Sequence, residues 1–375
     1  MVRSAQRGRT VGLLLAGLLV IAVVALIVVP RLGGDAGGGP PDGNVRTVRV
    51  LAGSEKRDFF ADPAVGARLA ELGYRLQVDT AGSREIATSR DLTPYDLAFP
   101  ADAPQADRIR AARKVTKSYV PFFSPMAIAT FQPIASLLQN AGVVRMDGGH
   151  RVLNMRGYLD LVDKNTRWSD LPGNTAFETG KSVLISSTDV RTSNSAALYL
   201  AIASYVENGG NVVADSAAAD RVAARCAPLF VKQGYVEQST QEPFDDFLTI
   251  GMGKTPMAMI YEAQFVARQL AKDGSISPDM VLMYPEPTIY AKHTVVPLTA
   301  DGDAAGRLLA TDPQLQRLAA QHGFRTADAA YGRRLATERG LAPPPSLVDV
   351  VEPPTAAIEE RMIDKIVNQA QGRPG

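Results

Sequence analysis

The chain has 375 residues, 46% of them hydrophobic, and its 40 Lys and Arg against 39 Asp and Glu leave a formal net charge of +1. The sequence has no basic stripe of the kind that nucleic-acid binders carry, and the single cysteine, Cys226, excludes an intrachain disulfide and a cysteine-rich metal site. His150, His293 and His322 lie too far apart for a metal-ligand motif. We therefore expect no metal, no cofactor and no nucleic-acid partner.

Residues 11–29 form an uncharged and almost wholly apolar run, with three arginines before it. As a helix this run would extend about 28 Å, close to the ~30 Å hydrocarbon core of a bilayer. The arginines predict a cytoplasmic tail over residues 1–10, a single-pass transmembrane helix, and an extracytoplasmic chain behind it. A secretory signal cleaved near residues 34–36 is the alternative. Residues 30–46, rich in Gly and Pro, predict a flexible linker.

From residue 47 onward, strand and helix patterns alternate. "TVRVLAG", "RLQVDT" and "YDLAFP" read as strands, and "DPAVGARLAELGY" reads as a helix between the first two. Such repeated strand-helix-strand units predict an α/β fold, with a parallel sheet covered by helices.

A second α/β set follows an extended, aromatic, Pro-punctuated segment at residues 117–133. It comprises the predicted strands "KSVLISS", "NVVADS" and "TPMAMI", with a predicted helix over residues 195–208. A second extended segment, "DMVLMYPEPTIYAKHTVVPL", then returns the chain to the first α/β set. Two crossings predict a hinge with a cleft. They divide the chain into lobe 1, residues 47–123 and 285–375, and lobe 2, residues 124–284.

Polar side chains gather where predicted strands end and helices begin. In an open α/β sheet, ligands bind beyond the carboxyl ends of strands, where helix N-termini offer unpaired N–H groups. The loop before the 195–208 helix carries six hydroxyl or amide side chains beside Arg191, although one cap needs only one. The bland alternative is a single cap in a polar loop, and Gly-Ser turns are equally ordinary. The candidate ligand-binding residues are Ser54, Ser83, Ser187, Thr188, Arg191, Ser193, Asn194, Ser195, Tyr261 and Glu262.

Catalytic motifs find no support in the sequence. "GMGKTP" lacks the first glycine of a phosphate-binding loop, because that position is Leu248, and Pro256 interrupts the helix that should follow. No G-x-S-x-G is present either. We therefore predict no enzymatic activity and no catalytic residues.

The order of several segments resembles that of a type II periplasmic solute-binding protein, in particular bacterial extracellular solute-binding protein family 11, relatives of the molybdate-binding carriers. The segments include "TVRVLAGSE", "YVPFFSPMAIATF", "STDVRTSNSAALYLA" and "KTPMAMIYEAQF", and the resemblance covers roughly residues 47–325. It implies two α/β lobes with a hinge and a ligand between them, with Ser54, Ser83, Ser193 and Tyr261 matching cleft positions. The apolar N-terminal run and the tail depart from that pattern.

Together these observations predict a membrane-tethered, extracytoplasmic bacterial solute-binding protein. It would close two lobes on a small molecule, with oxyanions among the candidates, and serve the permease of an ABC-type transporter. The alternative is a ligand-sensing or protein-interaction module on the same scaffold without a role in transport, because a fold does not fix a function.

Overall fold

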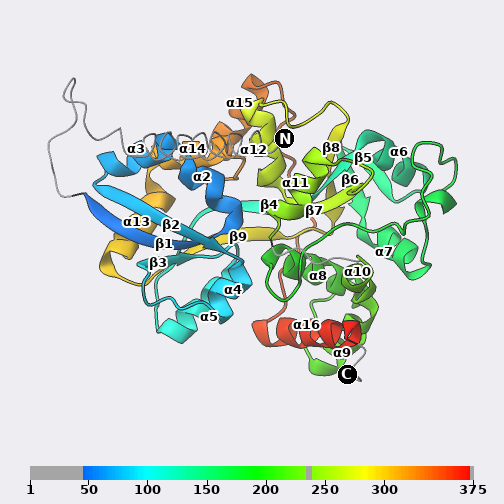
Figure 1. The fold of residues 1–375 in the computed structure, drawn as a ribbon, viewed down its shortest axis with the longest axis horizontal. Coiled ribbons are helices and arrows are strands. Elements are labelled where there is room, and N and C mark those ends of the chain that lie inside the picture. Colours follow the sequence, from blue (N-terminus) through cyan, green and yellow to red (C-terminus); the bar gives the residue numbers. More distant parts are fainter. Residues whose placement is uncertain (1–44, 234–238, 372–375) are drawn as a thin grey trace, which may run out of the picture. The chain divides into compact units, whose positions relative to one another are not determined.

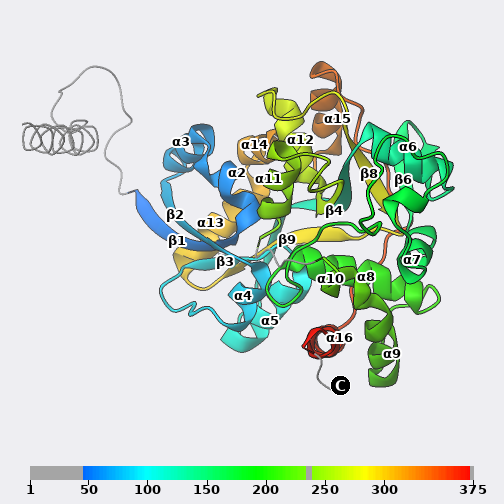
Figure 2. The same ribbon diagram turned by 45° about the vertical axis from the view of Figure 1, so that its right-hand side comes forward.

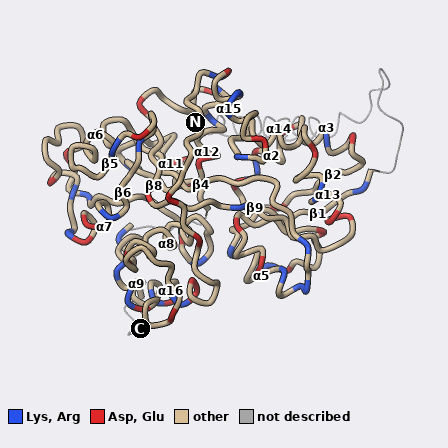
Figure 3. Tube along the Cα trace, turned by 180° about the vertical axis from the view of Figure 1, so that it is seen from behind, with Lys and Arg blue, Asp and Glu red and all other residues tan. Residues whose placement is uncertain are grey.

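The computed structural model describes residues 45–233 and 239–371, which belong to the compact unit Asn44–Gly375. The predicted cytoplasmic tail, the transmembrane helix and nearly all of the linker lie outside the described residues. Within the described ranges, no helix combines the length and the apolar character needed to cross a bilayer. Lys and Arg are interspersed with Asp and Glu along the described trace (Figure 3).

The nine strands of the described residues form one connected sheet in the order β2-β1-β3-β9-β4-β8-β6-β5, with β7 also paired to β4. β1 pairs in parallel with both β2 and β3 (Figure 1). The strands are β1 (Arg46–Gly53), β2 (Tyr74–Ala81), β3 (Leu97–Phe99), β4 (Tyr119–Phe131), β5 (Val144–Asp147), β6 (His150–Asn154), β7 (Met257–Tyr261), β8 (Met280–Glu286) and β9 (Tyr290–Pro297).

The long strand β4 joins two regions of the sheet. Its first half pairs with β9, which in turn pairs with β3. Its second half, from Met126 to Phe131, pairs with β7 and β8. We call the part around β1, β2 and β3 the first region and the part around β7, β8, β6 and β5 the second region. The predicted crossing at residues 117–133 is therefore an extended strand, as its Pro and aromatic pattern indicated.

Helices cover both regions (Figures 1 and 2). Asp62 caps α3 through the Ala64 N–H, and Pro63 begins that helix, as the sequence predicted. The helices are η2 (Ser54–Lys56), α2 (Arg57–Ala61), α3 (Pro63–Glu71), α4 (Ser83–Thr88), α5 (Ala103–Arg113), α6 (Gln132–Asn140), α7 (Met155–Asp163), η3 (Trp168–Asp170), α8 (Asn194–Glu207), α9 (Ser216–Cys226), α10 (Pro228–Val231), α11 (Gln241–Thr249), α12 (Glu262–Ala271), α13 (Ala300–Thr311), α14 (Pro313–Gln321), α15 (Ala329–Glu338) and α16 (Ala356–Ala370).

Each region has its own hydrophobic core. In the first, Val48 and Val50 of β1 pack with Phe99 of β3. In the second, Ile128 of β4 packs with residues of β7 and α8, and almost the whole of α8 is buried. A buried side chain of this size contributes about 1.5–3 kcal/mol, so each region has a substantial core of its own. The lobe boundaries given by the sequence stay a prediction.

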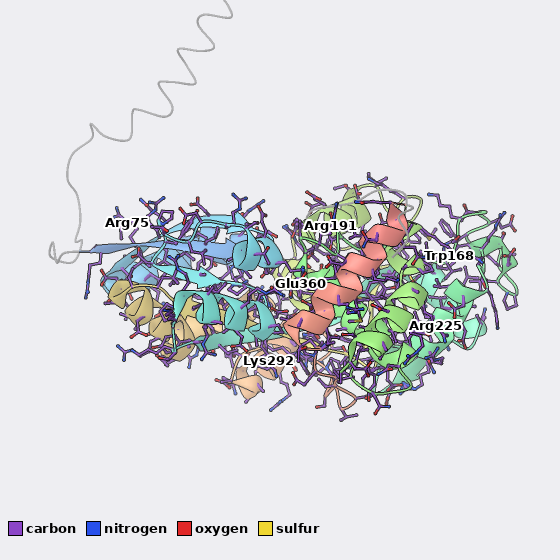
Figure 4. The ribbon with its side chains drawn as sticks, turned by 90° about the horizontal axis from the view of Figure 1, so that it is seen from below. Arg75, Trp168, Arg191, Arg225, Lys292 and Glu360 are labelled. Atoms are coloured by element: carbon purple, nitrogen blue, oxygen red, sulfur yellow. The ribbon has the colours of Figure 1, made fainter. Side chains whose placement is uncertain are left out.

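The last helix, α16, contacts both regions. Met362, Ile363 and Ile366 join the core of the second region, and the helix packs against α9. Its acidic residues Glu359 and Glu360 instead bind Arg84 of α4 in the first region. Seen from below, α16 runs beside the helices of both regions (Figure 4).

Two predicted strands are absent from the second region. In "KSVLISS", Val183 and Ile185 are buried as the alternating pattern indicated. However, the Val183 N–H donates to Thr166 and the Ser186 N–H donates to Met257. The backbone bonds of this segment therefore go to two separate partners, and only two isolated bridges form, at Ser182 and at Ser186. "NVVADS" forms no strand either, and Val212 is partly exposed.

Candidate functional site

The carboxyl ends of the three parallel strands of the first region meet the start of α8. Ser54 follows β1, Ser83 follows β2 and Asp102 comes shortly after β3. A Cβ atom on Gly82 would lie 2.6 Å from the carbonyl oxygen of Thr192, so the loop after β2 touches the loop before α8. Only glycine permits this approach, and it brings two of the sequence-predicted loops together.

The predicted polar loop forms a buried hydroxyl network. The Ser195 hydroxyl lies 3.1 Å from that of Thr188 and 3.0 Å from that of Ser193. It also lies 2.7 Å from the hydroxyl of Thr240, which precedes α11. Ser193 is the N-cap residue of α8, but its side chain makes no capping hydrogen bond. The side chains of this loop therefore do more than cap a helix.

Asn194 and Tyr261, both predicted ligand residues, lie together. The Asn194 side-chain amide donates to the Tyr261 hydroxyl at 3.3 Å, and both residues are buried. Tyr261 ends β7 and Asn194 begins α8, so this contact joins two elements of the second region at the edge that faces Ser54. Burial raises the pKa of the Tyr261 phenol, so the group stays protonated and can donate a hydrogen bond.

Ser54 and Tyr261 line one cavity of about 210 Å³. The Ser54 hydroxyl lies 3.0 Å from that of Ser239. Drug-sized ligands occupy pockets of about 300–1,000 Å³, so this cavity fits a small ligand. The other polar residues around it are Glu55, Arg57, Asp58, Gln241, Asp245, Gln264, Arg268 and His322.

Glu55, Lys56 and His293 form a buried group of ionisable side chains that the sequence analysis missed, and Glu55 lines this cavity. Glu55 binds Lys56 and lies 3.3 Å from His293 Nδ1. Burial alone would raise the pKa of Glu55, but the charge of Lys56 and the contact with His293 outweigh it and lower that pKa to about 2. Burial and the charge of Lys56 lower the pKa of His293 to about 4, so the imidazole is neutral at pH 7.

A second buried charged cluster connects α4, α5 and α16. Arg84 donates to Glu359 at 2.7 Å and to both carboxylate oxygens of Glu360 at 2.7 Å. Gln105 also donates to Glu359, at 3.3 Å, and its backbone N–H donates to Asp102 at 3.0 Å. Burial and the charge of Glu359 raise the pKa of Asp102 to about 7. Burial also raises the pKa of Glu359, although Arg84 opposes that shift.

Three of the predicted residues have partners of their own. Arg191 is half exposed (Figure 4) and binds Asp189, two residues before it in the chain. Ser187 donates its backbone N–H to Gln233, and its buried hydroxyl has no partner among the described residues. Ser83 accepts a hydrogen bond from the Ala101 N–H at 2.9 Å, which ties the loop after β2 to the loop after β3.

Glu262 faces a different cavity, of about 510 Å³, and the two cavities are lined by different faces of α12. Arg325 binds both of its oxygens at 2.6 Å, and the Tyr284 hydroxyl donates to it at 2.7 Å. Arg325 also donates to the Tyr290 hydroxyl and to the carbonyl of Pro345. The structure therefore separates Glu262 from the other predicted ligand residues.

The buried charged residues that the sequence analysis missed differ in how much local signal they carry. Glu55 and Lys56 directly follow Ser54, and Asp102 follows the predicted strand "YDLAFP", so the rule that picked Ser54 also points to them. Glu359 carries no comparable local signal, since it reaches the cluster from 275 residues beyond Arg84. No group of three or more metal-ligating side chains with suitable placement occurs in the described ranges.

The fold matches solved periplasmic binding proteins over most of their length. A periplasmic thiamin binding protein shares 12% identity, with 90% of this chain and 99% of that chain covered and a TM-score of 0.52. The periplasmic binding protein AfuA from Actinobacillus pleuropneumoniae shares 12% identity, with 87% of this chain and 98% of that chain covered and a TM-score of 0.53. The ferric binding protein from Campylobacter jejuni shares 11% identity, with 86% of this chain and 99% of that chain covered and a TM-score of 0.53.

At these identities the likeness establishes the fold alone. The described chain has the two-lobed α/β fold of periplasmic binding proteins, which confirms that part of the predicted fold class. The sheet is mixed and not parallel as the sequence predicted, because β4 and β9 cross between the regions in opposite directions and β4 also runs antiparallel to β7 and β8. The N-terminal transmembrane helix stays a prediction. No protein-family model matches the chain, and no curated protein matches it. Membership of solute-binding family 11 therefore stays a prediction.

Proposed function

We propose that this protein binds a small solute outside the cytoplasm and delivers it to an ABC-type transporter. The observation that carries the proposal is the convergence of Ser54, Asn194 and Tyr261 from both regions of the sheet beside a small cavity. The convergence point lies beyond the carboxyl ends of the parallel strands, where open α/β sheets bind ligands. The three similar structures are titled as binding proteins, which further supports a binding role over an enzymatic one.

The fold alone leaves the ligand open. The titles of the similar structures name thiamin, ferric ion and bound fructose-6-phosphate, which are three unlike chemistries. The hydroxyl groups before α8 and the positive end of the helix dipole support an oxyanion or a carboxylate group at that position. The cavity volume of about 210 Å³ supports a small ligand.

The direct test is titration of the detergent-solubilised full chain with inorganic anions, amines, amino acids and sugar phosphates, followed by calorimetry and thermal shift. Tyr261→Phe removes one hydroxyl from the cavity wall and should weaken binding about three- to tenfold, the value of one hydrogen bond. Tyr331→Phe, on α15 and away from this cavity, is the matched control and should leave the affinity unchanged. Equal affinity in both variants would remove Tyr261 from the site.

The proposal includes a membrane tether over residues 11–29, based on their apolar run and the arginines before it. The intact mass of the membrane-extracted protein tests it. A full-length mass with N-terminal Met1 supports the tether. A mature N-terminus near residue 37 would show instead a cleaved signal and a secreted protein.

Transport is tested by capture of the full chain from membranes after mild crosslinking. Recovery of integral-membrane subunits together with an ATPase supports delivery to a transporter. Recovery of a non-transporter protein alone, with ligand binding intact, would favour the alternative of a sensing or interaction module on the same scaffold.

A further inference from the structure

The buried cluster around Asp102 contains more hydrogen-bond acceptors than donors. Four of its oxygens have no hydrogen-bond partner among the described residues: Asp102 Oδ2, Gln105 Oε1, Asn194 Oδ1 and Glu359 Oε1. Each of these four side chains is at least nine-tenths buried. Buried acceptors without donors are costly, and nearly all buried polar groups in folded proteins are paired.

The four residues belong to one cluster. Gln105 bonds to both Asp102 and Glu359, as described above. The charge of Glu359 acts on Asp102, and the Asn194 amide lies near enough to affect the same carboxyl group. Asn194 also contacts Tyr261, which lines the small cavity. The cluster is therefore next to the candidate ligand site.

The nearby cations are already engaged. Arg84 directs its guanidinium to Glu359, Glu360 and the Arg191 carbonyl. Arg108 binds Glu360, and Lys56 binds Glu55. Asp102 is thus the one buried carboxyl of this cluster that has no ion-pair partner among the described residues.

We propose that this cluster is the subsite for the positively charged, N–H-bearing end of the ligand, a primary ammonium or a guanidinium group. Such a group carries several donors and one positive charge, which match the free acceptors and the unpaired Asp102. The inference rests on the proposed function, because the lobes must open to admit the ligand.

The experiment titrates the full chain with probes that separate charge from hydrogen bonding. Putrescine and L-arginine carry cationic N–H donors, tetramethylammonium carries charge without donors, and sulfate and phosphate are anions. We expect putrescine or L-arginine to bind and tetramethylammonium to bind at least tenfold more weakly. Binding of sulfate or phosphate without either amine, or no binding by any of these probes, would overturn this inference. The proposed function is overturned only if the wider panel of solutes named above also fails to bind.

Variants locate the binding to the cluster. Asp102→Asn should weaken the affinity for the amine ten- to a hundredfold, the value of a charge-assisted hydrogen bond. Asp107→Asn, on the exposed side of the same helix α5, is the matched control and should change it less than twofold. If Asp102 only caps α5, both variants will bind the amine equally, and the proposed subsite will be wrong.

The pH profile provides an independent readout. Because Asp102 must be ionised to pair with a cation, amine affinity should rise as the pH increases through about 7 and level off above it. The profile should flatten in Asp102→Asn. Arg84, Arg108, Lys56, Glu359 and Glu360 also face this cluster, so the same measurement in Glu360→Gln checks that Asp102 is the group responsible. An unchanged profile in Asp102→Asn contradicts the assignment.

Discussion

The buried carboxylates Glu262 and Asp102 belong to two separate clusters, which differ in how completely their hydrogen-bonding groups are paired. Glu262 has two guanidinium bonds and a tyrosine hydroxyl, and its partner Arg325 has further acceptors. Asp102 has one backbone donor and one oxygen without a partner among the described residues. A saturated cluster supports a structural role, whereas an unsaturated one supports binding from outside. Four variants test this contrast.

The largest expected effect comes from Arg325→Leu. It would leave Glu262, which is 2% exposed, without its ion-pair partner. Breaking one side of a buried ion pair costs about 3–5 kcal/mol of unfolding free energy, measured by urea denaturation. Ligand affinity should stay within twofold. Arg333→Leu, exposed on α15, is the control. A large loss of affinity at wild-type stability would show that the Glu262 cluster binds ligand too.

Asp102→Asn should instead raise the free energy of unfolding of the unliganded protein. The folded pKa of about 7 lies above the ordinary value of 3.8, so this carboxyl costs stability progressively as the pH rises from about 4 to 7. The amide has no such cost, and above pH 7 the variant should gain on the order of 4 kcal/mol of unfolding free energy. Denaturation at pH 5 and pH 8 measures the difference. A gain that is equal at both pH values would contradict the raised pKa.

The effect of His293 on stability has the opposite dependence on pH. Its folded pKa of about 4 lies below the ordinary value of 6.5, so the stability that the neutral imidazole contributes is lost as the pH falls from 6.5 towards 4. The two slopes oppose each other in the wild-type protein. Asp102→Asn should therefore also expose a loss of stability on acidification that the wild type partly hides.

Ser195→Ala should have an intermediate effect. The variant leaves the hydroxyls of Thr188, Ser193 and Thr240 without their shared partner. A loss of about 1–2 kcal/mol is expected from unpaired buried groups. Ser136→Ala, on the half-exposed side of α6, should cost much less. If the two variants lose the same amount, the network is not a stabilising unit.

Arg191→Ala should have the smallest effect. Its side chain is half exposed and binds Asp189, and exposed pairs contribute about 0.2–1 kcal/mol. We expect a change in unfolding free energy below 1 kcal/mol and a change in ligand affinity below twofold. A tenfold loss of affinity would instead support the ligand-binding role that the sequence predicts for this residue.

The sequence predicted the fold class well, because local patterns specify it. The helix predicted over residues 195–208 is α8, Asn194–Glu207, and "TPMAMI" is β7. The strand predicted for "KSVLISS" was wrong, because burial of Val183 and Ile185 produces the same alternation of apolar and polar residues as a paired strand. Pairing depends on the neighbouring backbone, which lies elsewhere in the chain.

Residues of the candidate site could be predicted from the sequence where they lie at the end of a predicted strand or the start of a predicted helix. Ser54, Asn194 and Tyr261 follow that rule, and their convergence is visible only in the structure. Glu262 also follows a strand, yet it faces the opposite cavity because adjacent residues at a strand end point in different directions. Glu359 lies in a helix of the tail, where only tertiary structure brings it to Arg84.

The contact between Arg84 and Glu359 has a consequence for the order in which this protein can fold. The residues up to α5 contain Arg84 but not its partner, so Arg84 must stay solvated until α16 docks, since burying it unpaired would be costly. Contacts between distant residues slow folding because a long loop must close first. We therefore expect the last folding step to wait for α16, whichever region collapses earlier.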